Sequence, residues 1–314
     1  MSRITTDLDL ALSHLKKGDI VAIPTETVYG LAGNAENAKA IEAIYAIKNR
    51  PLNHPLIMHV AEDWDLSRWV SFIPDYAKVL IQHFWPGPLT LVMKKTEAVS
   101  PLLTGGQDTV ALRCPKHPVA QTLLKRLGLP LVAPSANPFG KISPTTALHV
   151  KQSFKEADLL ILDGGRCEVG IESTILSAVN PAGYSLLRPG VIDIAQINAL
   201  IGDKALKEES TLRVPGKLAN HYQPEKPLFC FATMDAIDAF CQSLTEPVYV
   251  LSFTDSEQAD YCFSSSPAKA AFELYYQLRL ADESPAHYLV IELPPLEAQW
   301  EGVRERILKA GQKA

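Results

Sequence analysis

The chain has 314 residues, of which 47% are hydrophobic and 21% are charged. At about 150 residues per domain, this length predicts roughly two domains, each with a core of its own. The composition excludes an intrinsically disordered chain. No apolar stretch approaches the ~18 residues that span a bilayer, and the first residues lack a signal-peptide core. We therefore expect a cytoplasmic protein without a membrane partner.

The distribution of charge indicates which part of the chain binds an anionic ligand, and the cysteines indicate which structural sites to exclude. Residues 225–314 hold 7 Lys and Arg against 14 Asp and Glu, whereas the rest of the chain has a small positive excess. The first part is thus the better candidate for an anionic ligand. The five cysteines are widely spaced and form no CxxC pair, which argues against disulfides and structural zinc. We expect Cys114 and Cys167 to be buried thiols without a chemical role.

The first predicted domain, residues 1–203, alternates helices with short apolar strands. It opens with a helix whose apolar stripe is Leu8, Leu12 and Leu15, followed by a strand within 19–24. A second helix over 37–48 ends before Pro51, because the residue preceding a proline disfavours the helical region. Further strands and the helices 75–84 and 117–127 follow. The alternation predicts an α/β fold with a mostly buried, mixed sheet.

The rest of the chain reads as a linker and a smaller domain. Residues 204–224 lose the periodicity and gain charges and prolines, as a linker does. Residues 225–314 predict a small βαβ-type domain. Its strands are expected at 227–232, 247–253 and 287–293, and its helices at 235–244, 267–280 and 297–310.

Polar residues follow many of the predicted strands, where ligands of α/β sheets tend to bind. The common phosphate-loop, dinucleotide, nucleophile-elbow and zinc-helix motifs are missing. Four basic residues could instead converge on one anion: Lys48, Arg50, Arg113 and Arg188. Taken singly, each is better explained as a solvated surface charge.

Hydroxyl and amide groups near the strand ends could orient a small polar substrate, although turn formation and helix capping explain each of them too. They are Thr25, Thr27, Thr109, Ser135, Asn137, Ser143 and Ser173. His54 and His59 are too few for a metal site, so we expect no metal held by the protein. Glu26 could be a general base or an anchor for its turn.

Several segments, in this order, resemble the YrdC-like threonylcarbamoyl-AMP synthases. They are residues 23–31 (IPTETVYGL), 48–51 (KNRP) with 55–57 and His59, 85–90 (WPGPLT), 108–113 (DTVALR), 134–137 (PSAN), 172–174 (EST) and 187–190 (LRPG). The second domain resembles the extra domain of the long form of these enzymes, joined by a motif that includes His221, Tyr222 and Pro224. Lys217 stands where that motif usually has Met.

The resemblance implies a YrdC-like twisted mixed sheet with helices, plus a smaller, Rossmann-like C-terminal α/β domain. It also implies a reaction in which ATP, L-threonine and bicarbonate or CO2 give threonylcarbamoyl-AMP and pyrophosphate. A downstream tRNA threonylcarbamoyl-transfer system would then use the product. Mg²⁺ is expected with ATP, bound mainly by phosphate oxygens and water.

Residue by residue, the resemblance places the nucleotide on Lys48, Arg50, Ser135, Asn137, Ser143 and Arg188, with further contacts from His54, Thr109, His221 and Tyr222. Lys48 and Arg50 are the catalytic candidates. The threonine part falls to Thr27, His59, Arg113 and Ser173. We expect neither Lys48 nor Arg50 in a core, so that alanine at either position should abolish activity with little loss of stability.

Three questions stay open at this point. The main alternative function is a double-stranded RNA or tRNA binder without catalysis, against which the first 224 residues show no large basic cluster. Carbamoyl transfer in metallocentre maturation ranks third. We also expect residues 204–224 to form a lid over the nucleotide, the alternative being that His221 and Tyr222 only pack the second domain onto the first.

Overall fold

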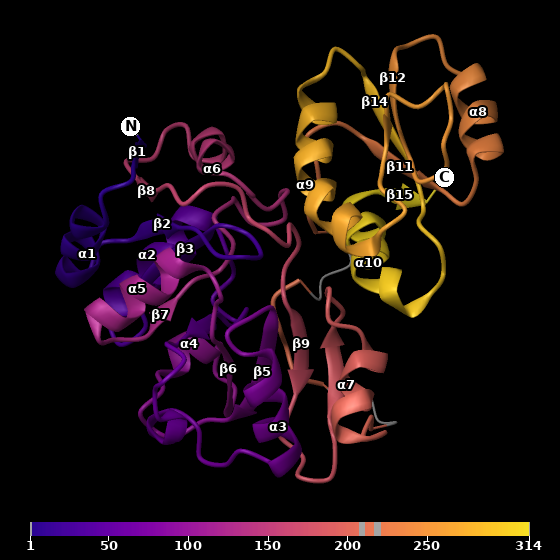
Figure 1. Ribbon diagram of the computed structural model, residues 1–314. Helices are drawn as coiled ribbons and strands as arrows, with labels where there is room; N and C mark the ends of the chain where they lie inside the picture. Colours follow the sequence, from indigo (N-terminus) through magenta and orange to yellow (C-terminus); the bar gives the residue numbers. More distant parts are fainter. Residues whose placement is uncertain (1, 207–210, 217–220, 314) are drawn as a thin grey trace.

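The computed structural model describes residues 2–206, 211–216 and 221–313. Two sheets form, one in each domain, and the second domain packs against the first through its helices α9 and α10 (Figure 1). The first sheet has the strand order β1-β8-β2-β3-β7-β4-β6-β5-β9-β10, and the second has the order β13-β12-β14-β11-β15. The α/β class and the two-domain organisation predicted from the sequence are confirmed.

The first domain combines parallel and antiparallel pairs, as expected of a mixed sheet. For example, β4 runs parallel to β6, and β5 runs antiparallel to β6. The strands are β1 (Arg3–Thr5), β2 (Val21–Ile23), β3 (Gly30–Asn34), β4 (Ile57–His59), β5 (Leu89–Lys94), β6 (Thr109–Arg113), β7 (Leu131–Val132), β8 (Leu160–Leu162), β9 (Thr174–Ser177) and β10 (Ser185–Arg188).

Helices cover this sheet, and their caps explain where they begin and end. They are α1 (Leu8–Lys17), α2 (Ala38–Lys48), α3 (Asp75–Phe84), α4 (Pro101–Thr104), α5 (Pro118–Leu127), α6 (Ala147–Ser153) and α7 (Ile194–Ile201), with the 3-10 turn η1 (Leu66–Arg68). Helix α2 ends at Lys48, as predicted, because Asn49 takes the left-handed conformation at φ 52°. Arg50 therefore lies beyond the end of the helix, where the backbone takes a new direction.

The second domain is a five-stranded sheet whose strands pair in parallel. Its elements are β11 (Leu228–Phe231), α8 (Met234–Gln242), β12 (Val248–Ser252), β13 (Tyr261–Cys262), α9 (Pro267–Glu283), β14 (Tyr288–Glu292), η2 (Ala298–Trp300), α10 (Glu301–Ala310) and β15 (Gln312–Lys313). Helix α8 covers one face, and α9 and α10 cover the other (Figure 1).

The two domains approach each other closely at α10. A Cβ on Gly302 would lie 2.6 Å from the Gly190 carbonyl oxygen, so only glycine fits at this point of the helix. Arg166 of the first domain also lies 3.8 Å over the Phe272 ring of α9 and donates to its carbonyl at 3.0 Å. The second domain is thus fixed onto the first by direct backbone and cation-π contacts.

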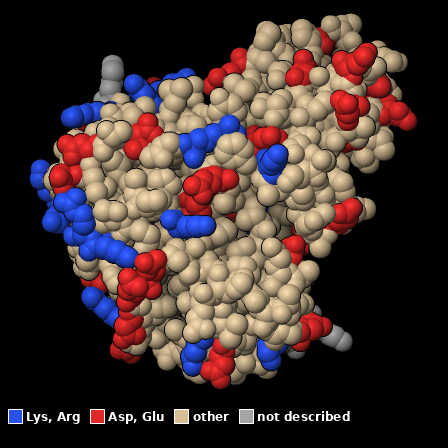
Figure 2. All heavy atoms as spheres, in the orientation of Figure 1, with Lys and Arg blue, Asp and Glu red and all other residues tan. Residues whose placement is uncertain are grey.

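The structure also shows where the thiols and the acidic side chains lie. Cys114 and Cys167 are buried free thiols. Acidic side chains gather on the outer end of the second domain, at the upper right of the space-filling view (Figure 2). In the described part of the chain, no helix has the length and apolar character needed to cross a membrane.

Candidate active site

A cavity lies where several strands of the first domain end, and linker residues 215–216 and 221–222 also line it. It is lined by Val28, Arg50, Ile57, His59, Arg113, Ala133, Pro134, Ser135, Glu172, Ser173, Arg188, Pro215, Gly216, His221 and Tyr222. Strands β4 and β6 are parallel with His59 paired to Arg113, so both side chains stand at the same sheet edge. Strand β10 ends nearby at Arg188.

Three arginines give this cavity its positive charge, and all three side chains are buried. Arg50 donates from Nη2 to the Pro55 carbonyl at 2.9 Å, and burial lowers the pKa of its guanidinium to about 10. Arg113 Nη2 lies 2.7 Å from Glu26 Oε1, while Arg113 Nε has no hydrogen-bond partner among the described residues. Buried guanidinium groups with unused donors favour an anionic ligand.

Arg188 completes the set, and its donors meet carbonyl oxygens. Its Nε and Nη2 donate to the Ser173 carbonyl at 3.1 and 2.9 Å, and its Nη1 donates to the Pro215 carbonyl at 3.1 Å. Burial lowers the pKa of this guanidinium too. These neutral contacts hold the side chain in place without cancelling its charge.

Neutral polar groups stand beside the arginines. Burial, together with the charge of Arg113, lowers the pKa of His59 to about 3. The pKa of His221 is also lowered to about 3, mainly by burial. Both imidazoles are therefore uncharged at neutral pH. His59 Nδ1, His221 Nδ1 and the Tyr222 hydroxyl have no hydrogen-bond partner in the described structure, so they can serve a bound polar molecule.

The structure brings together on this cavity eight of the residues selected from the sequence: Arg50, His59, Arg113, Ser135, Ser173, Arg188, His221 and Tyr222. The other six are not among its lining residues: Thr27, Lys48, His54, Thr109, Asn137 and Ser143. Thr27 is hydrogen-bonded to Thr25 at 3.0 Å, and the Thr109 hydroxyl is buried without a partner among the described residues. The His54 ring stands edge-on to Phe139, with 5.4 Å between the ring centroids.

Lys48 corrects one expectation. Its side chain is 1% exposed, so it does belong to a buried region, and Arg50 is likewise 7% exposed. Lys48 Nζ donates to the carbonyl oxygens of Ser135 and Asn137. The side chain leaves the end of α2 towards this loop because the loop carbonyls supply the acceptors that a buried ammonium group requires. Lys48 thus shapes the loop that presents Ser135 to the cavity.

Two acids lie at or near the site. From the sequence, the role of Glu26 stayed open, and Glu172 was not among the candidate site residues. Glu26 accepts the Lys116 amide at Oε2 (3.0 Å) in addition to its ion pair with Arg113, which favours the anchor over the general base. Glu172 lines the cavity. The one sequence signal for it is its position beside Ser173 in the segment 172–174 (EST).

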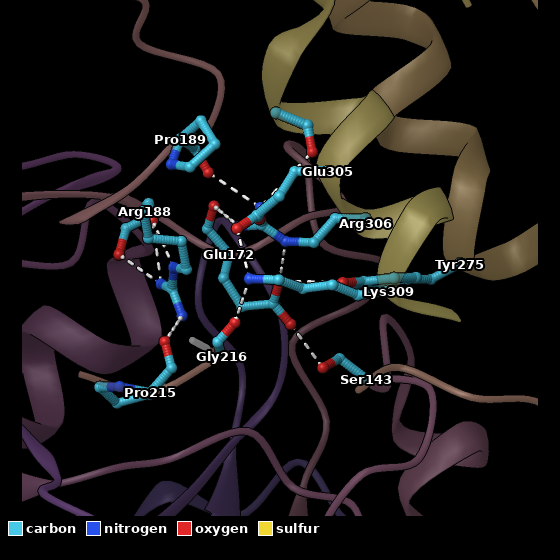
Figure 3. A network of polar contacts seen from close by, with 12 residues as sticks. Ser143, Glu172, Arg188, Pro189, Pro215, Gly216, Tyr275, Glu305, Arg306 and Lys309 are labelled. Atoms are coloured by element: carbon cyan, nitrogen blue, oxygen red, sulfur yellow. Dashed lines mark hydrogen bonds and ion pairs between the residues drawn. The ribbon is translucent and has the colours of Figure 1, made fainter. Parts of the chain in front are cut away.

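Glu172 is the centre of a polar network that joins the two domains (Figure 3). Its Oε2 accepts Arg306 Nε at 2.9 Å and the Tyr275 hydroxyl at 2.9 Å, and its Oε1 accepts the Ser143 hydroxyl at 2.5 Å. Burial by itself would raise the pKa of Glu172, but the charges of Arg306 and Arg188 and the Ser143 hydrogen bond lower it to about 2. The carboxylate is therefore ionised at neutral pH.

The described ends of the linker touch both domains. The His221 amide donates to the Lys309 carbonyl at 3.0 Å, and Lys309 Nζ donates to the Gly216 carbonyl. Gly216 has φ 80°, and a Cβ there would lie 2.3 Å from the Tyr222 hydroxyl, so this position requires glycine. Lys217, where the linker departs from the motif, and the central part of the predicted linker at 207–210 and 217–220 lie outside the described residues.

Comparison with known proteins identifies the family. Residues 13–190 match the family described as telomere recombination, and residues 192–311 match the one described as threonylcarbamoyl-AMP synthase, C-terminal domain. The threonylcarbamoyl-AMP synthase of Bacillus subtilis is 37% identical over 317 residues, covering 96% of this chain and 91% of that protein. That of Pyrococcus abyssi is 41% identical over 221 residues, covering 68% of this chain and 65% of that protein.

A solved structure agrees with this result over the whole length. The crystal structure of P. abyssi Sua5 complexed with L-threonine has a TM-score of 0.89 and 32% identity, covering 100% of this chain and 99% of that one. Both predicted domains therefore have their counterparts in one known protein. The chain belongs to the threonylcarbamoyl-AMP synthase family, and it has both the YrdC-like domain and the C-terminal domain of the long form.

Proposed function

We propose that this chain is an L-threonylcarbamoyladenylate synthase that converts ATP, L-threonine and bicarbonate or CO2 into threonylcarbamoyl-AMP and pyrophosphate. The observation that carries the proposal is the convergence of Arg50, Arg113 and Arg188 on one cavity beside neutral donors. Two anionic substrates, a triphosphate and a carbamate, require such a concentration of buried positive charge.

The nucleotide is assigned to the side of the cavity nearest the linker. Arg50 and Arg188 would contact its phosphates, and Ser135, His221 and Tyr222 would contact the remainder. Lys48, Asn137 and Ser143 act from behind this wall: Lys48 and Asn137 support the loop 135–141, and Ser143 supports Glu172. His54 and Thr109 do not line the cavity, and they are retained in the proposal as further nucleotide contacts.

The threonine is assigned to the end of strands β4 and β6. Arg113 would hold its carboxylate, since the guanidinium keeps an unused Nε donor. His59 and Ser173 line the same cavity and can bind the hydroxyl and the carbamate. Thr27 lies in the buried turn beside Thr25 and shapes this end of the site.

The chemistry needs no protein nucleophile. The threonine amine adds to CO2 and loses a proton, which gives a carbamate. A carbamate oxygen then attacks the α-phosphorus of ATP, and pyrophosphate leaves with the electron pair of the broken P–O bond. The protein contributes by positioning and by neutralising charge, and each charge-assisted hydrogen bond contributes on the order of 1.5–3 kcal/mol.

Mg²⁺ is proposed to arrive with ATP. Glu172 is a carboxylate on the cavity, but its oxygens already accept from Ser143, Tyr275 and Arg306. Phosphate oxygens and water, the ligands that Mg²⁺ commonly keeps, would therefore hold the ion. When bound, the ion would offset the charge of the pyrophosphate group.

The product suits a downstream tRNA threonylcarbamoyl-transfer system in the cytoplasm, and a weak contact with tRNA itself is part of the proposal. The decisive test is pyrophosphate release from ATP, measured with and without threonine and bicarbonate. We expect release that depends on both co-substrates. Release that ignores them, or tight binding of double-stranded RNA without any release, would favour the alternative functions.

A further inference from the structure

An acid stands in the middle of this cationic cavity. Glu172 is the one acid among the lining residues in the described part of the chain, and Arg188 donates to the carbonyl oxygen of the next residue, Ser173. A buried carboxylate at this place would repel a triphosphate, and it would also be the strongest available partner for Arg188. Some feature of the fold has to prevent both effects.

Arg306 of the second domain supplies that feature. Its side chain is 0% exposed and reaches from α10 into the first domain. Besides the Nε bond to Glu172 Oε2 at 2.9 Å, its Nη2 donates to the Glu172 carbonyl at 3.3 Å and its Nη1 to the Pro189 carbonyl at 2.8 Å. The guanidinium therefore holds both the carboxylate and the backbone next to Arg188.

Glu305 and Lys309 of α10 form further polar contacts with Arg306 and with the linker. Glu305 accepts hydrogen bonds from Arg306 and from Lys309, and Lys309 also donates to Gly216. The charges of Glu172 and Arg306 both act on Arg188. Its Nε and Nη groups, however, donate hydrogen bonds to Ser173 and to the Pro215 carbonyl. Its charge is thus left for a ligand.

We propose that Arg306 is a positioning residue of the catalytic cavity: by occupying Glu172, it keeps Arg188 free to bind phosphate. The second domain then sets the ATP affinity of a site whose other charged residues belong to the first domain. This inference rests on the proposed function, because it takes ATP as the ligand of Arg188.

The test is a double-mutant cycle on the full chain, with Mg-ATP binding measured by calorimetry and the KM for ATP measured by pyrophosphate release. In Arg306→Met, Glu172 is released and captures Arg188, so Kd and KM should rise about tenfold or more. Adding Glu172→Gln removes the competing charge, so the double variant should return to within about threefold of the wild type. Because kcat reports chemistry on bound substrate, it should change less than KM.

Two further variants keep the test decisive. Arg304→Met is the matched control, since Arg304 lies on the same helix and donates to Pro294 within the second domain; its ATP affinity should equal that of the wild type. Arg306→Lys retains the charge and should fall between the wild type and Arg306→Met. If Arg306→Met does not fold, the double variant is compared with the wild type directly, and a large loss of ATP affinity in it overturns the proposal.

The two proposals fail in different ways. A wild-type chain that binds ATP but releases no pyrophosphate with threonine and bicarbonate contradicts the proposed function. A fully active wild type whose Arg306→Met defect persists in the Glu172→Gln background contradicts the positioning role alone, because Arg188 then has no competing acid and ATP affinity should have returned.

Discussion

Lys48 Nζ donates a hydrogen bond of 2.5 Å to the Ser135 carbonyl, and this bond ties the end of helix α2 to the loop after strand β7. The contact joins residues 87 positions apart, and it changes what the lysine can do. Because Lys48 Nζ donates to two loop carbonyls, the side chain holds the loop that forms part of the cavity wall. We therefore expect Lys48 to affect catalysis through Ser135 and its neighbours.

The first prediction concerns Lys48. In Lys48→Met, two buried carbonyls lose their donor, so the free energy of unfolding should fall by about 1–3 kcal/mol and pyrophosphate release should be lost with it. Lys39→Met is the control, since Lys39 is exposed on the first turn of the same helix. Urea denaturation measures the stability. A variant that loses activity at unchanged stability would instead support the expectation that Lys48 contacts the nucleotide directly.

The second prediction concerns Arg113 and the choice of amino acid. Arg113→Lys keeps the charge but loses the planar fork that reaches Glu26 and the cavity together, so threonine affinity should fall about tenfold or more. Valine should bind the wild type on the order of a hundredfold more weakly, because a site built for a hydroxyl leaves polar groups unpaired without it. Calorimetry with both amino acids tests this. Equal binding of valine and threonine would show that the hydroxyl is not recognised here.

Arg126→Lys provides the control for this substitution. Arg126 also pairs with an acid, Asp9, but it lies exposed on helix α5. Its replacement should leave threonine affinity unchanged. A similar loss in both variants would point to a general effect on the domain instead of a contact in the site.

The third prediction is a pH dependence of stability. His221 has a folded-state pKa of about 3, below its ordinary value of 6.5, because it is buried next to cationic groups. As the pH falls below 6.5, the unfolded chain takes up the proton first, so acid favours unfolding. Between pH 6.5 and about pH 3, each pH unit lowers the free energy of unfolding by up to about 1.4 kcal/mol per such histidine.

Replacing the histidine should therefore flatten the curve. The free energy of unfolding of His221→Gln should fall by up to about 1.4 kcal/mol less than that of the wild type between pH 6.5 and 5.5. His83→Gln, at an exposed position of α3, serves as the control. Parallel curves for His221→Gln and the wild type would mean that His221 does not carry this proton linkage. His59, with a pKa also lowered to about 3, predicts the same sign.

Local signals allowed much of this structure to be predicted. The end of α2 follows from Pro51, and the strands that present His59, Arg113 and Arg188 follow from short apolar runs bounded by polar residues. The buried lysine did not follow, because its acceptors come from a loop that only the tertiary fold brings near. The Glu172–Arg306 pair joins residues 134 positions apart in different domains, and neither local period nor charge pattern marks Arg306 as buried.

The last prediction concerns the expectation that residues 204–224 form a lid over the nucleotide. Tyr222 is 1% exposed, and its ring lies under Arg306 (5.3 Å) and beside Tyr275 (5.7 Å between centroids), so it packs against the second domain. The same residue also lines the cavity, with His221 beside it at 4.2 Å. Tyr222 therefore packs against the second domain and also lines the cavity, so an experiment has to separate the two roles that the sequence left as alternatives.

Tyr222→Ala should open the cavity to water, so that the mixed anhydride is hydrolysed and AMP appears faster relative to threonylcarbamoyl-AMP. Tyr222→Phe retains the ring and loses only the hydroxyl, so its product ratio should stay near that of the wild type. Chromatography of both nucleotides over time measures the ratio, and a thermal melt reports whether the domains still pack. If Tyr222→Ala melts earlier but accumulates the intermediate as the wild type does, the residue packs the domains together and does not shield the product from water.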